Sequence, residues 1–319
     1  MKMKKEYLIL VVVIAALAVY LYQRSADRTH YTLPSLPALA AADITKIQMT
    51  RGAETVVLVR RDGRWFIDPP GYPVDPKTAQ EMLDTLGGLT LTALVSESKN
   101  YALYELDDAQ KAGVKAWQGD QLKRDFDVGK AAPSFRHTFI RLAGDDRVFH
   151  VRDNISFRFR TRIEDLRDKT MLAFNRQDIQ EIRVTKDGAA LTLVRTPAPA
   201  EAPAGGQAPA NAWQSGDGRP ANGAAVEALL GELASLQADG FIEDRDKAAF
   251  GEPIYALSLK GSQEHSLAVF APTGGDGKDH PAVSSGSAYP FQLTEDHARR
   301  LMKQPEDFFK PEEQEVPPK

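Results

Sequence analysis

Histidine is the first residue type to consider for metal or acid–base chemistry, because a neutral imidazole binds metals and titrates near neutral pH. The sequence contains no His-x-x-x-His pair and no HExxH zinc motif. His137 and His150 fall on neighbouring predicted strands and could approach each other, but hydrogen-bonded or solvated rings are the favoured interpretation. The chain has no cysteine, which excludes thiol nucleophiles, cysteine-ligated zinc and disulfides. We therefore expect no metal site.

Motifs for nucleophilic catalysis and phosphate binding are incomplete in this sequence. No G-x-S-x-G elbow occurs. Residues 274–278 (Gly-Gly-Asp-Gly-Lys) lack the spacing and the strand-to-helix context of a phosphate-binding loop, and residues 243–246 lack the spacing of a calcium loop. We therefore expect no catalytic residue, no cofactor and no enzymatic activity. A hydrolase is the enzymatic alternative, and it would need carboxylates or the two strand histidines to converge in a pocket.

Three arginines form the most distinctive charged feature of the sequence. Residues 157–162 read Phe-Arg-Phe-Arg-Thr-Arg, so a strand would place Arg158, Arg160 and Arg162 on one face. Such a face could contact anionic lipid headgroups or an acidic partner. The alternative is a solvated strand face, balanced by the acidic residues at positions 164, 165 and 168.

Four aromatic residues are candidates for stacking against a ligand. Trp65, Tyr72, Trp117 and Trp213 would serve this role if they lined a cleft between two domains, because domain interfaces are common ligand sites. The ligand would then be a glycan or a peptide. The favoured alternative is that the tryptophans anchor hydrophobic cores.

Length and composition are typical of a folded protein with about two domains, at roughly 150 residues each. The chain has 319 residues, of which 42% are hydrophobic and 26% are charged. The 40 basic and 44 acidic residues give a net charge of −4. A chain with this charge has no electrostatic basis for binding nucleic acid.

The N-terminal segment predicts membrane attachment. Residues 7–22 carry no charge, follow three lysines, and would form a helix about 24 Å long. The positive charges before this segment favour an N-terminus in the cytoplasm. The rest of the chain would then lie on the periplasmic side of a bacterial inner membrane. We expect an uncleaved signal anchor over residues 1–28 and a linker over 29–42. A cleaved signal peptide is the alternative.

An internal repeat organises the remainder of the chain. Residues 43–60 align with residues 178–195 without a gap, and seven positions of this block are identical. Trp65 then corresponds to Trp213, and three helix-spaced leucines recur at one offset. We therefore predict repeat 1 over residues 43–175 and repeat 2 over residues 176–310. The Pro/Ala-rich loop of residues 196–212 interrupts the second copy, and residues 311–319 are predicted to be a disordered tail.

Each copy shows the pattern of an α+β domain with a mostly antiparallel sheet. Short β-rich runs at residues 44–50, 55–60 and 64–67 are separated by turn sequences. A helix then follows Asp75, a good N-cap, and its apolar positions recur at helical spacing. More strands follow this helix, at residues 114–117, 122–128, 137–142 and 148–151. The second copy repeats the arrangement, with one main helix and a short one.

Several stretches resemble a known family. Residues 164–174 (EDLRDKTMLAF) and 126–130 (FDVGK), followed by residues 137–142, are similar to the domain-of-unknown-function family DUF4340. We interpret the Gly-Lys pair at 129–130 as a turn, and Leu166, Leu172 and Phe174 as anchors of a connector between the copies. The resemblance implies a single-anchored bacterial envelope protein, in some cases associated with ABC-type export systems of the gliding-motility kind. It implies no catalytic residues, so we expect a scaffold or accessory subunit, with ligand binding as the alternative.

Overall fold

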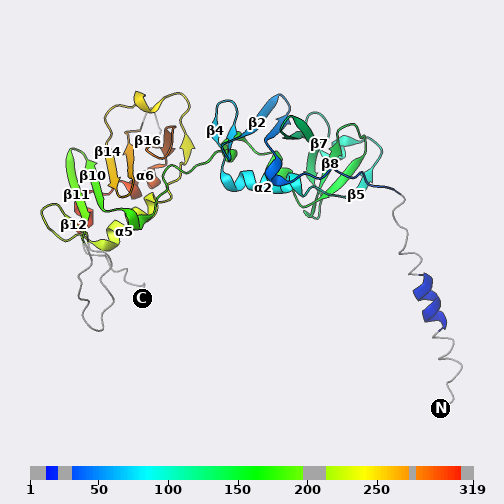
Figure 1. Cartoon of the computed structure of the whole chain (residues 1–319), viewed down its shortest axis with the longest axis horizontal. Helices are drawn as coiled ribbons and strands as arrows, with labels where there is room; N and C mark the ends of the chain where they lie inside the picture. The colour runs from blue at the N-terminus through cyan, green and yellow to red at the C-terminus, as the bar shows by residue number, and fades with distance from the viewer. Residues whose placement is uncertain (1–11, 21–30, 197–212, 273–277, 310–319) are drawn as a thin grey trace, which may run out of the picture. The chain divides into compact units, whose positions relative to one another are not determined.

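The computed structural model describes residues 12–20, 31–196, 213–272 and 278–309, and it divides the chain into two compact units. Figure 1 shows the sheets and helices of both units. The first unit ends at Asp168 and the second begins at Lys169. The predicted boundary lay seven residues later. The earlier division arises because Leu166 is buried in the first core, whereas Met171 and Leu172 are already buried in the second.

The first unit is built on a nine-stranded sheet in which every neighbouring pair is antiparallel. Its strand order is β4-β3-β2-β1-β6-β7-β8-β9-β5. The strands are β1 (Lys46–Arg51), β2 (Glu54–Arg61), β3 (Arg64–Ile67), β4 (Tyr72–Pro73), β5 (Leu91–Ser96), β6 (Ala112–Gln118), β7 (Gln121–Ala131), β8 (His137–Leu142) and β9 (Val148–Arg152).

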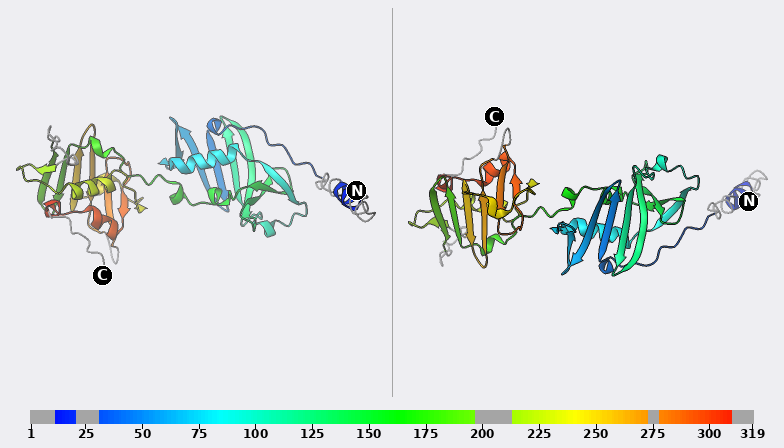
Figure 2. Two further views of the ribbon diagram at one scale, coloured as in Figure 1. Left: turned by 90° about the horizontal axis from the view of Figure 1, so that it is seen from below. Right: turned by 90° about the horizontal axis from the view of Figure 1, so that it is seen from above.

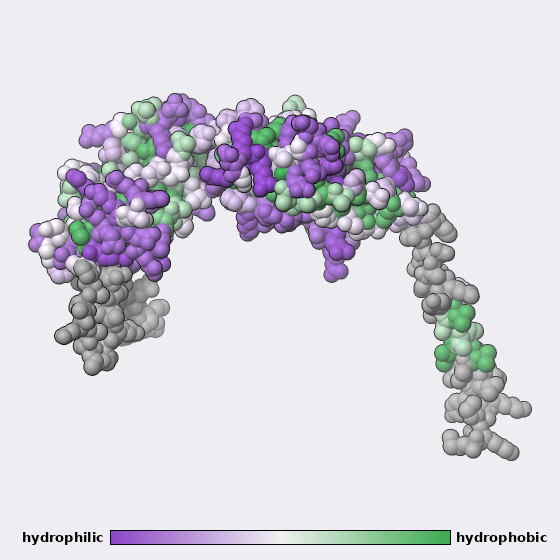
Figure 3. All heavy atoms as spheres, viewed as in Figure 1, coloured by the Kyte–Doolittle hydropathy of each residue, from purple (hydrophilic) through white to green (hydrophobic). Residues whose placement is uncertain are grey.

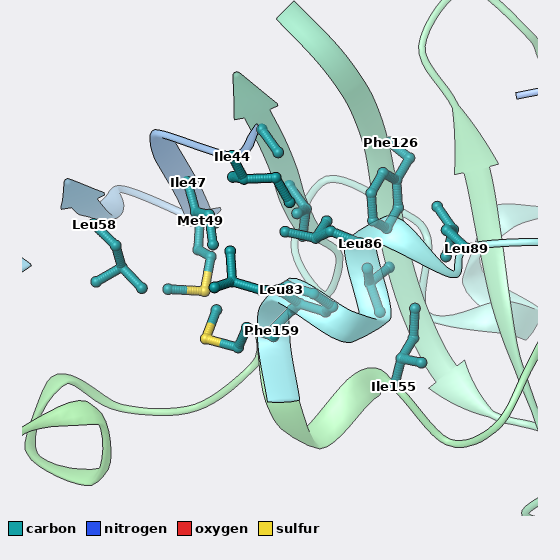
Figure 4. Packing of buried hydrophobic residues seen from close by; sticks show 14 of the residues in the cluster. Ile44, Ile47, Met49, Leu58, Leu83, Leu86, Leu89, Phe126, Ile155 and Phe159 are labelled. Atoms are coloured by element: carbon teal, nitrogen blue, oxygen red, sulfur yellow. The ribbon is translucent and has the colours of Figure 1, made fainter. Parts of the chain in front are cut away.

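One main helix, α2 (Pro76–Gly87), covers one face of this sheet (Figure 2). It begins as predicted, because the Asp75 side chain accepts a hydrogen bond from the backbone N–H of Thr78 at 2.7 Å. The helix buries one stripe, and Figure 4 shows Leu83 and Leu86 pointing toward the strand residues of the core. The opposite side of the helix is exposed to solvent.

The second unit has an eight-stranded sheet of the same organisation, with the order β12-β11-β10-β14-β15-β16-β17-β13. Its main helix, α5 (Gly223–Leu233), is capped by the Asn222 side chain and buries Val226, Leu229, Leu230 and Leu233. The strands are β10 (Glu181–Lys186), β11 (Ala189–Arg195), β12 (Trp213–Ser215), β13 (Gly240–Phe241), β14 (Tyr255–Lys260), β15 (Glu264–Val269), β16 (His280–Ser284) and β17 (Phe291–Leu293).

The predicted α+β class is confirmed, and within the described residues each strand of the second unit has a counterpart in the first, where only β4 has none. When the two strand orders are aligned, β3 is equivalent to β12, β2 to β11 and β1 to β10. The equivalence extends to the other end of the sheets, where β5 matches β13. In each unit the main helix follows the first meander in the chain. Leu83 and Leu230, which the repeat aligns, are both buried.

Short helices complete the fold. In the first unit these are η1 (Ala41–Asp43), η2 (Tyr101–Tyr104), α3 (Ser156–Phe159) and α4 (Ile163–Leu166). In the second unit they are η3 (Arg176–Asp178), η4 (Lys247–Ala249), α6 (Glu295–Leu301) and η5 (Pro305–Phe309).

Two local predictions were wrong. Residues 157–162 do not form a strand, because α3 occupies their first half. This helix buries Phe159 on the same side as Ile155, the N-cap residue four positions earlier. Gly129 and Lys130 do not form a turn but lie inside β7. A Cβ atom at Gly129 would lie 2.2 Å from the carbonyl oxygen of Tyr104 in the short helix over Tyr101–Tyr104, so the glycine allows this helix to approach β7 closely instead of changing the direction of the chain.

The N-terminal segment is described only in part. Residues 12–20 are helical, their side chains are exposed, and they are apolar throughout (Figure 3). Among the residues that the structure describes, no helix is both long and apolar enough to span a membrane. The other residues of the predicted anchor, most of the Pro/Ala-rich loop and the predicted tail lie outside the described residues.

Candidate functional site

A cavity of about 410 Å³ opens in the first unit beside the β2–β3 hairpin. Segments distant in the sequence form its walls: η1, the adjoining ends of β2 and β3, and the first two turns of α2. Its volume lies in the range of natural ligand pockets. The lining residues are Ala41, Ala42, Arg60, Gly63, Arg64, Trp65, Val74, Pro76, Ala79, Gln80 and Leu83.

The hairpin turn positions the two largest side chains of the cavity. Arg60 on β2 and Trp65 on β3 face each other as a cross-strand pair. A two-residue turn at Asp62 and Gly63 joins the strands, and both residues have positive φ, 49° and 79°. Such turns match the twist of paired strands and fix their register. The local sequence Asp-Gly therefore determines that Arg60 and Trp65 share one face of the hairpin.

Hydrogen bonds hold the remaining walls. Arg60 donates from Nη1 to the carbonyl oxygen of Ala42 in η1 at 2.7 Å. Across the cavity, Gln80 lies on the exposed side of α2 and donates from Nε2 to the Asp84 carboxylate at 2.8 Å. The floor is apolar, because Ala79 and Leu83 belong to the buried stripe of the same helix.

The charged side chains that line this cavity are all positive. Arg60 and Arg64 contribute two guanidinium groups, and no carboxylate is among the lining residues. Within the described residues neither of these arginines forms an ion pair, whereas the neighbouring Arg61 pairs with Asp68 at 2.8 Å. An apolar cavity with unpaired guanidinium groups at its rim can hold an anionic group.

Comparison with known proteins assigns the family. Residues 65–253, more than half of the chain, match the family described as Domain of unknown function (DUF4340). The chain belongs to this family. The DUF4340 match is one continuous stretch that begins at Trp65 of the cavity, so the two-copy interpretation stays a prediction. No curated protein and no solved structure matches the chain.

Of the four predicted aromatic residues of this DUF4340 protein, three lie in different surroundings within the first unit, and Trp213 belongs to the second unit. Trp65 lines the cavity and is 7% exposed, and Trp213 is buried in the core of the second unit. The ring of Tyr72 lies under the guanidinium group of Arg167, with 3.5 Å between the guanidinium carbon and the ring centroid. The Lys46 ammonium lies 4.6 Å from the ring centroid of Trp117. Only Trp65 therefore contributes to the candidate site.

The three predicted arginines do not share one exposed face. Arg158 lies 3.7 Å from the Glu81 carboxylate of α2, and Arg160 lies 2.7 Å from the Glu105 carboxylate after η2. Both side chains are largely buried, at 24% and 19% exposure, whereas Arg162 is exposed beside Glu164. Arg158 and Arg160 are therefore engaged in partly buried ion pairs within the first unit, and of the three only Arg162 is available to a partner without breaking such a pair.

The two strand histidines do approach each other, as predicted. The rings of His137 and His150 stack with 5.3 Å between their centroids. Burial lowers the pKa of His150 below its ordinary value, and the nearby charge of His137 adds to this effect. Among the described residues, no group of three or more His, Cys, Asp or Glu side chains could hold a metal ion.

Neither Arg60 nor Gln80 was predicted from the sequence to be a site residue. Arg60 was visible as an identity within the repeat, where it aligns with Arg195, but this signal alone does not separate a functional arginine from a structural one. Gln80 carried no signal, because an exposed glutamine is an ordinary helix residue.

Proposed function

We propose that this protein is a non-enzymatic binding component of a bacterial cell envelope, with the cavity beside Arg60 and Trp65 as its binding site. In this proposal residues 7–22 anchor the chain in the inner membrane, with a cytoplasmic N-terminus and both units in the periplasm. The partner is a protein of the same membrane. The resemblance to DUF4340 suggests an ABC-type export system, in which the chain acts as a scaffold or accessory subunit.

The observation that carries this proposal is the chemistry of the cavity. It combines an apolar floor with two guanidinium groups that have no ion-pair partner among the described residues. Its walls are a hydrogen-bonded hairpin and a capped helix, so a ligand would not have to order them on binding. An anchor would keep the cavity near a membrane partner and raise the effective concentration, so that a small contact suffices.

The alternative ligand is a glycan, and the geometry favours a peptide over it. Sugar binding relies on an exposed aromatic ring face, whereas the Trp65 side chain is 7% exposed and presents little of its ring. Guanidinium groups suit the polar side chains of a peptide.

Photo-crosslinking in cells tests this function. A benzophenone amino acid at position 80, beside the cavity, should give one discrete adduct with a membrane protein. The same residue at position 135, which is 73% exposed and is not among the residues that line the cavity, provides the control. Adducts from position 80 that are absent, or identical to those from position 135, would refute the proposed binding site.

A further inference from the structure

The two units place an arginine and a tryptophan at the same point of their sheets. Arg60 faces Trp65 across β2 and β3, and Arg195 faces Trp213 across β11 and β12. In both pairs the arginine is near the end of its strand and donates to a carbonyl oxygen of the short helix before β1 or β10: Ala42 in the first unit, Arg176 in the second.

The main helices correspond equally closely. The buried stripe of α2 and that of α5 coincide when positions are shifted by 147, from Ala79 and Val226 onward. The N-caps Asp75 and Asn222 follow the same shift. Gln80 therefore occupies the position that Glu227 occupies in the second unit.

In the second unit a carboxylate completes the arrangement. Arg195 lies over the ring of Trp213, with 4.9 Å between the guanidinium carbon and the ring centroid. The Glu227 carboxylate lies 3.5 Å from both the Arg195 guanidinium group and the indole Nε1 of Trp213. The Arg195 side chain is only 9% exposed. In the second unit, the carboxylate that faces the arginine and the indole N–H therefore comes from the same unit.

In the first unit the carboxylate is missing from this set. Gln80 replaces the glutamate, Arg60 is exposed, and the indole N–H of Trp65 has no acceptor among the described residues. Gln80, the equivalent of Glu227, lines the 410 Å³ cavity of the first unit. Arg64, at the rim, adds a second positive charge.

We infer that the first unit binds a carboxylate supplied by another molecule, at the position where the second unit uses its own Glu227. The ligand class is an acidic peptide segment, whose glutamate or aspartate side chain would accept hydrogen bonds from Arg60 and from the Trp65 indole. Its neighbouring atoms would cover the apolar floor formed by Ala79 and Leu83. This inference rests on the proposed function and specifies the chemistry of its ligand.

Fluorine NMR of the full chain in a mild detergent tests the inference. The protein contains three tryptophans, so labelling with 5-fluorotryptophan gives three signals, which Trp→Phe variants assign. The probe is acetyl-Gly-Glu-Glu-Gly-amide, and the control peptide carries glutamine in place of both glutamates. The acidic peptide should shift the Trp65 signal saturably and leave the Trp117 and Trp213 signals in place. An equal shift with the glutamine peptide would overturn the inference.

Two variants sharpen the test. Gln80→Glu supplies the internal carboxylate that the second unit has, and it should weaken peptide binding by about tenfold or more, the size of one charge-assisted hydrogen bond. Arg60→Met should abolish the Trp65 shift, whereas Arg61→Met, on the adjacent position of β2, should preserve it. Unchanged Trp117 and Trp213 signals verify folding. If Gln80→Glu or Arg60→Met bound the peptide as the wild type does, the inference would be wrong.

The two tests fail independently. If the acidic peptide shifted the Trp65 signal but no partner were crosslinked, the inference of carboxylate binding would stand. The proposed scaffold role would be refuted. If position 80 crosslinked to a partner but the protein did not discriminate between the two peptides, the proposed binding site would stand. The inference that it recognises a carboxylate would be refuted.

Discussion

Arg124 and Leu86 are joined by a hydrogen bond that ties the sheet of the first unit to the end of its main helix. The Arg124 Nε donates to the Leu86 carbonyl oxygen at 3.2 Å, and Nη1 donates to the carbonyl oxygen of Pro37 at 2.8 Å. The residue is only 4% exposed, and burial lowers its pKa. One side chain thus satisfies a helix-terminal carbonyl and also holds the segment that precedes the first strand.

Replacing Arg124 with methionine should destabilise the first unit by about 2 kcal/mol, because the buried hydrogen bond to Leu86 and the partly buried one to Pro37 are lost while the aliphatic packing is retained. Urea denaturation of the full chain measures this change. Lys123→Met, the adjacent substitution on β7, is the matched control and should change the free energy of unfolding by less than about 0.5 kcal/mol. Equal effects of the two substitutions would contradict the role of Arg124.

Gly129→Ala should destabilise the first unit by about 2 kcal/mol. The new methyl group would meet the Tyr104 carbonyl oxygen at 2.2 Å and the Leu106 side chain at 3.0 Å, so the backbone must move. Gly113→Ala in the neighbouring strand β6 is the control, since its nearest neighbour, the Asp127 carboxylate, lies at an ordinary 3.6 Å. Thermal unfolding of both variants compares them directly. A control as unstable as Gly129→Ala would show that any strand glycine in this sheet is sensitive.

The stability of the first unit should fall as the pH falls through the ordinary pKa of histidine, 6.5. The folded pKa of His150 is lowered, so the unfolded chain takes up a proton at a higher pH than the folded chain does. The loss continues until the pH reaches the folded pKa. Urea denaturation between about pH 8 and pH 5 measures the slope, which His150→Phe should reduce. Parallel slopes for wild type and variant would assign the pH dependence to other groups.

Cysteine labelling should define the membrane topology, because the native chain has no cysteine to interfere. In intact spheroplasts, a membrane-impermeant maleimide should label Ser262→Cys, at an exposed position before β15. Lys4→Cys should be labelled only after lysis, since the proposed anchor leaves the N-terminus in the cytoplasm. Labelling of both positions in intact spheroplasts, or of neither, would exclude the proposed orientation.

Local sequence patterns predicted much of the fold because the interactions that specify them are local. Alternating apolar residues predicted the strands around Val114 and His137, and the Asp75 cap with its apolar stripe predicted α2. The same reasoning failed at residues 157–162. Phe157 and Phe159 suggest a strand, but the spacing of Ile155 and Phe159 suits a helix equally, and burial of the latter pair decides between them.

The sequence alone determined the α+β class, the repeated meander and helix, and the resemblance to DUF4340. The location of the candidate site became evident only from the folded chain. Arg60, Gln80 and Ala42 are separated along the chain, and only folding brings them to one cavity. The difference between Gln80 and Glu227 likewise could not be interpreted from the sequence, because only the folded units place each of them beside an arginine–tryptophan pair. The physical reason is that strand and helix periodicity are properties of neighbouring residues, whereas the pairing of charges depends on which distant residues the fold places in contact.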